Sequence, residues 1–457
     1  MFVNRHDELD ALDRWWRDGR RPAVVWGRRR VGKTALLQRF TDGRRAVFHT
    51  GAGRPEAGEL AQLARQAAAA APGGLRDLDA RPYVDWDDAL EDLAQRAADK
   101  PLLVVLDEFP EIVAGSPELP GVLRAFLDRA EARTTLRLLL CGSAVRHMEA
   151  LQEHRAPLYG RFDLSLQVHP FRPHEAALML PEMPPADRAM VHGLLGGVPL
   201  YLSWWDTAVG VADNLRRLVC RPAAALLTEG QLVLATEAER GDYPAAVLHA
   251  IASGRTRYGE IKDVLRAEPA RTLERLVELR LVERVSPVTD HDRSRRVHYR
   301  IADNFLAFYL QVVSRFRGEI ERGLGESILP VLVSCLDDFM GPRWEEMFRA
   351  HLRRLAPTGV LGDQIVAIGT WWTDASDAEI DAVALSGRAR RPVLAAEAKW
   401  ARSIDAQRVL DGLKLAASRL PGVDVHDLRF ALCAREQVRS VPAGVLTVTA
   451  ADVMSAD

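Results

Sequence analysis

Short runs of aliphatic and aromatic residues recur along the first third of the chain, at residues 23–26, 47–50, 102–106, 136–141 and 164–168. The run at 102–106 reads Leu-Leu-Val-Val-Leu and shows no alternation between apolar and polar positions. Such a run is typical of a strand that is buried on both faces of a parallel sheet. Helical patterns separate the runs, at residues 9–18, 58–71, 86–98 and 119–131. The pattern therefore predicts an α/β region with a five-stranded parallel sheet over residues 1–171.

The middle of the chain changes to short helical patterns. Proline and glycine breaks at 181–185 and 196–199 favour a small helical lid over residues 172–240. Residues 241–328 then show three helical patterns, at 245–252, 256–266 and 269–280, and two strand-like runs, at 281–285 and 296–301. That order, with a polar wing tip at 289–295, is the layout of a winged helix-turn-helix. We predict that the apolar helix at 304–310 is core.

The pattern of residues 329–457 predicts a second α/β domain. A helix at 335–354 is followed by strand-like runs at 364–368, 379–385 and 392–400, a helix at 403–420, and strands at 428–433 and 445–448. The predicted fold class of the whole chain is thus α/β, with a helical lid and a winged helix between two sheet domains.

The loop after the first strand carries the clearest chemistry. It reads Gly27, Arg28, Arg29, Arg30, Val31, Gly32, Lys33, Thr34, and Ala35 follows in the next helix. Strand, glycine-bounded loop and helix, in that order, are the context of a phosphate-binding P-loop. Lys33 would contact the β- and γ-phosphates of ATP, and the Thr34 hydroxyl would bind Mg²⁺. The pattern assigns no role to the three arginines inside the loop.

Two acids end the apolar run at 102–106. Asp107 is predicted to hold Mg²⁺ through water, and Glu108 to orient the attacking water, because ligands gather at the carboxyl ends of parallel strands. Ser143 follows the next strand. It is placed either to sense the γ-phosphate or to cap the following helix.

The third helix of the predicted winged helix carries Arg271, Arg275 and Arg280, as a recognition helix would. Residues 251–300 hold 12 Lys and Arg against 8 Asp and Glu, which is a mild basic excess. Winged helices also serve as packing modules between domains, and the sequence leaves both readings open.

A second set of chemical groups lies near the C-terminus. Glu397 and Lys399 stand two apart on one predicted strand and so share a face, and Asp381 comes alongside through hairpin pairing. Two carboxylates and a lysine are what metal-assisted phosphodiester cleavage needs. Asp381 and Glu397 would ligate Mg²⁺, Lys399 would position a water and stabilise charge, and Glu345 could complete the site.

The net charge of −2 argues against binding of polyanions over the whole surface. The four cysteines are far apart, so we expect no disulfide framework and no cysteine zinc site. We find no signal-like N-terminus and no membrane-spanning run, and expect a cytoplasmic protein without membrane contact.

These motifs together resemble the archaeal-type ATPase family, in the STAND branch of AAA+-like P-loop ATPases. Residues 2–8, 157–161 and 196–201 add to the resemblance. It implies that Arg5 lies near the base or ribose and that Pro199 belongs to a lid packed over the nucleotide. Arg161 would touch the γ-phosphate or form a salt bridge.

The C-terminal residues resemble the PD-(D/E)xK nuclease-like fold. They resemble more closely the domain of unknown function that accompanies archaeal-type ATPases, through Glu379-Ile380-Asp381 and Glu397-Ala398-Lys399. The sequence thus predicts an ATP-hydrolysing protein whose nucleotide cycle controls a Mg²⁺-dependent, DNA-acting domain. Alternatives are a non-nucleolytic switch or regulator with an inactive nuclease fold, and an ATPase whose winged helix and tail mediate self-association into a homo-oligomer.

Overall fold

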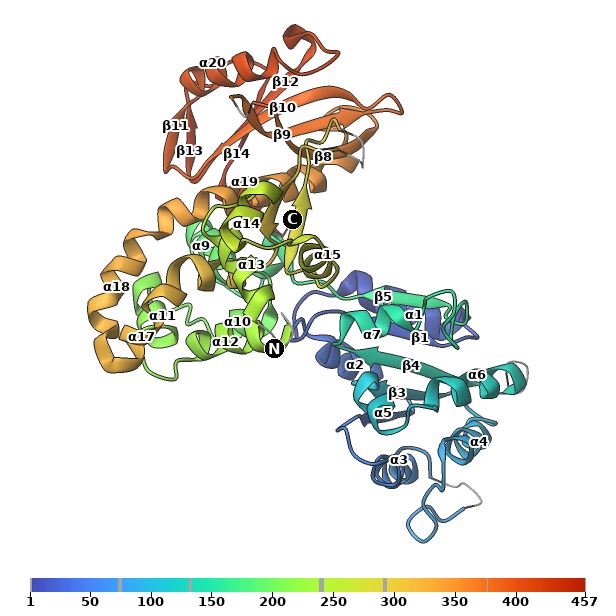
Figure 1. The fold of residues 1–457 in the computed structure, drawn as a ribbon. Helices are drawn as coiled ribbons and strands as arrows, with labels where there is room; N and C mark the ends of the chain where they lie inside the picture. Colours follow the sequence, from blue (N-terminus) through green and yellow to red (C-terminus); the bar gives the residue numbers. More distant parts are fainter. Residues whose placement is uncertain are drawn as a thin grey trace. The chain divides into compact units, whose positions relative to one another are not determined.

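The computed structural model describes residues 2–72, 76–130, 134–237, 242–290, 294–375 and 377–456. The chain forms two compact units, Met1–Pro170 and Phe171–Asp457 (Figure 1). The second unit contains the predicted lid, winged helix and C-terminal domain. The predicted boundary at 240/241 and part of the wing tip, residues 291–293, lie outside the described residues.

The first unit is built on a five-stranded parallel sheet, as predicted. Its strand order is β2 (Ala46–Thr50), β3 (Leu102–Asp107), β4 (Leu136–Gly142), β1 (Ala23–Trp26) and β5 (Leu164–Gln167). Its helices are α1 (His6–Asp18), α2 (Lys33–Thr41), α3 (Glu56–Ala70), α4 (Trp86–Arg96), α5 (Phe109–Gly115), α6 (Leu119–Ala130) and α7 (Val145–Ala150).

Helices cover both faces of this sheet, which explains the unbroken apolar runs. Val104 and Leu106 of β3 pack into one core with α3 to α7, whereas Leu103 and Val105 pack into a second core with α1 and α2 (Figure 1). Every residue of β3 is buried. Because neither face is exposed to water, no position in the middle of the strand favours a polar residue.

The second unit begins with helices. They are α8 (Pro173–Ala177), α9 (Pro185–Leu195), α10 (Pro199–Ser203), α11 (Val211–Leu218), α12 (Ala225–Glu237), α13 (Asp242–Ala252), α14 (Tyr258–Leu265) and α15 (Ala270–Glu278). The antiparallel hairpin of β6 (Val282–Val285) and β7 (His298–Ile301) follows, so three helices and a hairpin occur in the predicted order. Then come α16 (Asn304–Phe308), the π-helix η1 (Tyr309–Val313), α17 (Arg317–Glu319), α18 (Gly325–Ser334) and α19 (Leu336–Leu355). The aromatic residues of α16 are buried, which confirms that this helix is core.

A mixed sheet ends the chain. Its strand order is β14 (Val445–Val448), β12 (Arg429–Ala434), β10 (Arg391–Lys399), β9 (Glu379–Ser386) and β8 (Ile365–Trp372). Strands β8, β9 and β10 pair antiparallel, whereas β10, β12 and β14 pair parallel. A small pair, β11 (Ser403–Asp405) and β13 (Gln437–Arg439), the helix α20 (Ala406–Ala417) and the final helix α21 (Ala450–Val453) complete the domain. The apolar side chains of α20 cover one face of the sheet.

Two predicted boundaries in this domain are wrong. Strand β8 continues past residue 368 to Trp372, because Trp371 and Trp372 pair with Ile380 and Glu379 of β9. The helix predicted from residue 403 starts only at Ala406. Asp405 ends the short strand β11, and its carboxylate accepts a hydrogen bond from Arg408 N at 3.3 Å as the N-cap of α20.

We predict that Gly197→Ala destabilises the second unit by about 1–3 kcal/mol, the usual range for overpacking. A Cβ at Gly197 would lie 1.8 Å from the Phe171 carbonyl oxygen, and this backbone also pairs through Phe171 N and Gly197 O at 2.7 Å. The measurement is the midpoint of urea denaturation.

Gly412→Ala is the matched control. Gly412 lies inside α20, and a Cβ there meets no atom within 4 Å. Alanine should therefore stabilise the helix by about 1 kcal/mol. Equal midpoints for the two variants would contradict the steric argument.

Candidate functional site

The predicted P-loop connects β1 to α2 and is shaped by two glycines. Gly32 has φ +90°, a conformation that favours glycine. A Cβ at Gly27 would lie 2.3 Å from the Val168 carbonyl oxygen, so the loop passes directly against the residue that follows β5. The sequence pattern and the close packing both require glycine at these positions.

Lys33 folds back over this loop. Its Nζ donates hydrogen bonds to the carbonyl oxygens of Gly27 and Arg28, each at 2.9 Å. The side chain is buried, and burial lowers its pKa, against the opposing charges of Glu108 and Asp107. The ammonium group is therefore held inside the curve of the loop, where a phosphate would be bound.

The ends of β3 and β4 bring further polar groups together. Thr34 Oγ1 donates to Asp107 Oδ2 at 3.0 Å, which joins the P-loop helix to the end of β3. Ser143 Oγ donates to Glu108 Oε2 at 2.9 Å, which joins the ends of β4 and β3. The residue preceding α7 is Ala144, so Ser143 does not cap that helix with its side chain.

Cys141 is a neighbour that the sequence analysis did not assign. It lies in β4, it is buried, and burial followed by the charge of Asp107 raises the pKa of its thiol. The thiol therefore stays protonated beside the Asp107 carboxylate. The sequence gave no signal that Cys141 lies beside Asp107, because a cysteine in an apolar run is typical of any buried strand.

Arg5 and Arg161 lie in different places. The buried Arg5 guanidinium donates to the carbonyl oxygens of Val31 and His169, each at 2.8 Å, and so ties the N-terminus to the P-loop. Arg161 pairs with Asp128 at 2.5 Å and lines a hollow with Pro22 and Leu136, at the amino ends of the strands. The structure thus brings Arg5 to the P-loop, whereas Arg161 lies at the opposite edge of the sheet in an ion pair.

The other loop positions differ in their exposure. Arg29 and Ala35 are exposed, Arg28 and Arg30 are half-buried, and Val31 is buried. Pro199 is the first residue of α10 in the second unit, and its predicted contact with nucleotide stays a prediction.

The C-terminal candidates gather on one face of the mixed sheet. Ala396 of β10 pairs with Ala382 of β9, which places Glu397 beside Asp381. Asp381 Oδ2 accepts a hydrogen bond from Ala398 N at 2.8 Å, and Glu397 Oε1 contacts Lys399 Nζ at 2.5 Å. The predicted hairpin pairing thus brings these candidates together.

Helix α19 adds two groups to the same cluster. Burial, followed by the charge of Asp381, raises the pKa of Glu345 to about 8. Arg349, four residues later, donates to the Asp381 carbonyl oxygen at 2.5 Å and lies 3.9 Å from the Glu345 carboxylate. The sequence analysis missed Arg349, although its place one helical turn after Glu345 was a signal.

Burial raises the pKa of each carboxylate in this cluster, and the charge of Asp381 raises those of its neighbours further. Burial is the largest cause for Asp381, Glu397 and Glu379, and the charge of Asp381 is the next for Glu397 and Glu379. For Lys399, burial works in the opposite direction, but Glu397 and Asp381 raise its pKa. Negative charge is therefore in excess here.

The oxygen donors are those that Mg²⁺ prefers. As the side chains stand, however, no group of three His, Cys, Asp or Glu residues in the described ranges could hold a metal ion. Asp381 and Glu397 fit a magnesium site by chemistry and by position, and Glu397 would have to exchange its contact with Lys399 for the metal.

The predicted wing packs against this domain. Val288 N donates to the Thr370 carbonyl at 2.9 Å, and Arg296 Nη1 to the Trp372 carbonyl at 3.0 Å. The His298 ring lies 4.8 Å from the Trp372 ring. The wing therefore extends the edge of the sheet at β8, as a packing module would.

A second link joins the hairpin of β6 and β7 to α19. Arg300 of β7 lies 2.8 Å from Glu346, which also pairs with Arg349 at 3.0 Å and Arg353 at 2.8 Å. Burial alone would raise the pKa of Glu346, but these three arginines lower it to about 2. Because Glu346 directly follows Glu345, these ion pairs help to hold α19, the helix that carries Glu345, in place.

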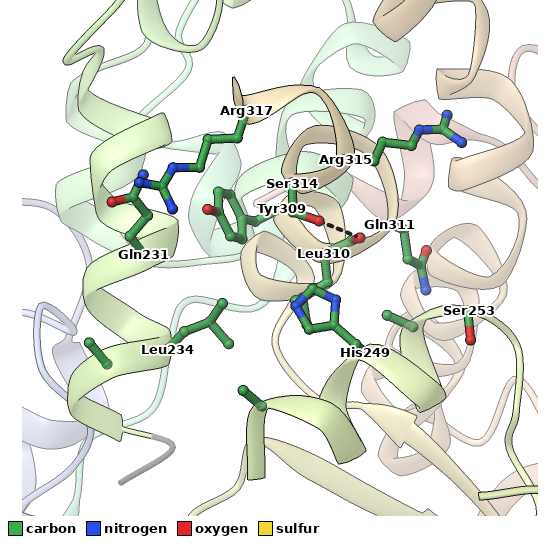
Figure 2. Close-up of a pocket in the computed structure, with 13 residues that line it drawn as sticks. Gln231, Leu234, His249, Ser253, Tyr309, Leu310, Gln311, Ser314, Arg315 and Arg317 are labelled. Carbon is green, nitrogen blue, oxygen red and sulfur yellow. Dashed lines mark hydrogen bonds between the residues drawn. The ribbon is translucent and has the colours of Figure 1, made fainter. Parts of the chain in front are cut away.

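A further cavity, of about 960 Å³, lies between α12, α13 and η1. Figure 2 shows the residues that line it. Several polar groups around it bond within the chain: Arg317 with Glu321 at 2.8 Å, Gln311 with Arg343 at 3.1 Å, and Ser314 with the Leu310 carbonyl at 3.0 Å. None of the described residues that line it belongs to the C-terminal group of candidates.

Comparison with known proteins supports the assignment of the first unit. Residues 2–203 match the model of a family described as an ATPase domain predominantly from Archaea. Residues 309–409 match a family of archaeal and bacterial proteins of unknown function. An uncharacterised protein of Methanocaldococcus jannaschii is 26% identical over 445 residues, which cover 95% of this chain and 96% of that protein.

The fold is also found among solved structures. The Walker-type ATPase of Pyrococcus abyssi matches with a TM-score of 0.53 and 21% identity, over 68% of this chain and 96% of that one. Together with the P-loop geometry, these findings give the N-terminal region the fold of a P-loop ATPase. The function of the C-terminal domain is unknown. No helix in the described parts of the chain is long and apolar enough to cross a membrane.

We predict that Lys33→Ala weakens ATP binding by at least about tenfold, because a charged hydrogen-bond donor to phosphate is lost. Arg161→Ala serves as the control and should leave the affinity unchanged, because its ion pair lies at the other edge of the sheet. Titration with a fluorescent ATP analogue measures both. An equal loss in the two variants would contradict the placement of Arg161.

Proposed function

We propose that the chain hydrolyses ATP and that its nucleotide cycle controls a Mg²⁺-dependent nuclease activity of the C-terminal domain on DNA. One observation carries the proposal: Asp381, Glu397 and Lys399 share a face of the sheet at the ends of paired strands, beside Glu345 of α19. Carboxylates next to a charged lysine are the groups that metal-assisted phosphodiester cleavage uses.

In the first unit, Lys33 and the P-loop backbone would bind the phosphates. Thr34 and Asp107, whose side chains bond to each other, would hold Mg²⁺, Asp107 through water. Glu108 orients the attacking water. Ser143 donates a hydrogen bond to the Glu108 carboxylate. From this position, Ser143 would sense the γ-phosphate. Hydrolysis of this kind is mainly positioning and electrostatic stabilisation.

In the C-terminal domain, Asp381 and Glu397 would hold Mg²⁺, which when bound supplies an activated water and neutralises phosphate charge. Lys399 keeps its proton and stabilises the negative charge that develops on the phosphate. Arg349 fixes the backbone of Asp381 through its carbonyl group.

Two observations favour a second candidate, a switch that does not cut. The wing is occupied by contacts with β8, and no three potential ligands in the described ranges are arranged to hold a metal. In that case the ATPase would control a C-terminal domain that binds DNA without cutting it.

We predict that Glu108→Gln reduces ATP hydrolysis by about a hundredfold or more, as expected when a group that orients or polarises water is lost. ATP binding should remain within about twofold, since Lys33 and Thr34 are unchanged. Phosphate release and nucleotide affinity are measured on the same preparation. A variant that loses binding together with hydrolysis would show that Glu108 supports the fold of the site instead.

The nuclease assignment predicts cleavage of plasmid, linear or single-stranded DNA with Mg²⁺ or Mn²⁺ by the full chain. Lys399→Ala should reduce the rate at least about a hundredfold. Lys414→Ala, an exposed lysine of α20, is the control and should cut like the wild type.

Each failure of this assay has a distinct meaning. Intact DNA under all metals, with and without ATP, rejects the nuclease and favours the switch. Undiminished cutting by Lys399→Ala would leave the activity real but place its site elsewhere.

A further inference from the structure

A basic hollow lies between the winged helix and the C-terminal sheet. It has a volume of about 610 Å³, and four arginines line it against one acid: Arg257, Arg284, Arg295, Arg296 and Asp374. Tyr258 and Gly259, the first residues of α14, line it too, and the first N–H groups of a helix have no acceptor within the helix. Positive charge and backbone donors therefore meet in one concave surface.

Part of this charge is not neutralised within the described chain. Arg296 pairs with Asp290 and lies 3.2 Å from Asp374. The exposed side chain of Arg295, by contrast, has no hydrogen-bond or ion-pair partner among the described residues. The hollow thus keeps a positive charge that can meet an anion.

The predicted recognition helix is less suited to a polyanion. On α15, the exposed Arg271 and Arg275 share the surface with the exposed Glu274 and Glu278. Opposite charges at neighbouring positions of a helix reduce its attraction for phosphates. Four arginines line the hollow against Asp374, and Asp290 pairs with Arg296, so the hollow still has the larger local excess of positive charge.

The sheet connects this hollow to the carboxylate cluster. Trp372, which lines the hollow, is the cross-strand partner of Glu379 on β9, and directly paired residues point to the same face. Asp381 lies two residues further along β9 and shares that face, about 7 Å away along the strand. The hollow and the cluster are therefore neighbours on one surface.

Aromatic rings add a second feature. The half-buried rings of Tyr258, His298 and Tyr299 line the hollow among the arginines, whereas the Trp372 ring is buried against His298. Basic groups that bind a sugar–phosphate backbone, interleaved with rings on which bases can stack, are the usual equipment of a surface that binds a nucleic-acid strand.

We propose that this hollow binds the phosphodiester backbone of a nucleic-acid strand and leads it to the Asp381 and Glu397 cluster. The proposal rests on the proposed function, since it gives that site its substrate path, but it concerns binding and not cleavage. It assigns the contact to Arg257 and Arg295 at the start of α14 and in the wing, and not to the arginines of α15.

The test compares two double variants of the full chain with equal change in charge. Arg257→Ala/Arg295→Ala alters the hollow, and Arg271→Ala/Arg275→Ala alters α15; all four side chains are exposed. Fluorescein-labelled single-stranded DNA, duplex DNA and RNA of one sequence are titrated by anisotropy, with EDTA present to prevent cutting. Unchanged ATP affinity and circular dichroism verify that the variants fold.

The hollow variant should bind at least about tenfold more weakly than the wild type, because two charged contacts are lost. The slope of log K against log salt should fall by about 1 for each phosphate contact removed. The α15 variant should bind like the wild type. The three probes show whether the backbone comes from DNA or RNA.

Three results overturn the proposal: no binding of any probe by the wild type, an unchanged affinity of the hollow variant, or an equal loss in the α15 variant. Binding that depends on the hollow without any cleavage supports the inference and rejects the nuclease function. The two proposals therefore fail separately.

Discussion

A strand that is buried on both faces can carry polar chemistry only near its ends, and both candidate sites follow from this constraint. All six residues of β3 are buried, and its last residue is Asp107, with Glu108 directly after it. In the C-terminal sheet, β9 begins with Glu379 and β10 ends with Lys399. The sheets therefore place reactive groups in a row along an edge, where groups from neighbouring strands can meet.

The two edges hold their charge in different ways. At the P-loop, the polar groups with a predicted role in catalysis have close partners: Lys33 bonds to loop carbonyls, Thr34 to Asp107, and Ser143 to Glu108. At the C-terminal cluster, carboxylates face one another, and their pKa values rise with burial and mutual repulsion. Such an arrangement costs stability in the free protein, so a function for the excess charge is the simplest reason for it. The neighbouring Glu346, which has three arginine partners, shows the opposite and purely structural arrangement.

The contact of the wing with β8 changes the meaning of the winged helix. Read from the sequence, its third helix with three arginines suggested contact with DNA. In the structure the wing packs on the sheet through Val288, Arg296 and His298, and the basic surface that results is made jointly by both domains. Packing and nucleic-acid contact, the two readings that the sequence left open, are then compatible in one surface.

The sequence by itself determined the order of the elements, the P-loop, and the acid pair Asp107 and Glu108 at the end of β3, because apolar periodicity and glycine spacing are local properties of the chain. It also indicated that Asp381, Glu397 and Lys399 belong together, since strand alternation fixes which residues share a face. Only the tertiary structure decided that Arg5 ties the N-terminus to the P-loop, that Arg161 lies at the other edge of its sheet, and that the basic hollow adjoins the cluster. Those contacts join residues from distant parts of the chain, and side-chain partners at such separations leave no periodic signal in the sequence.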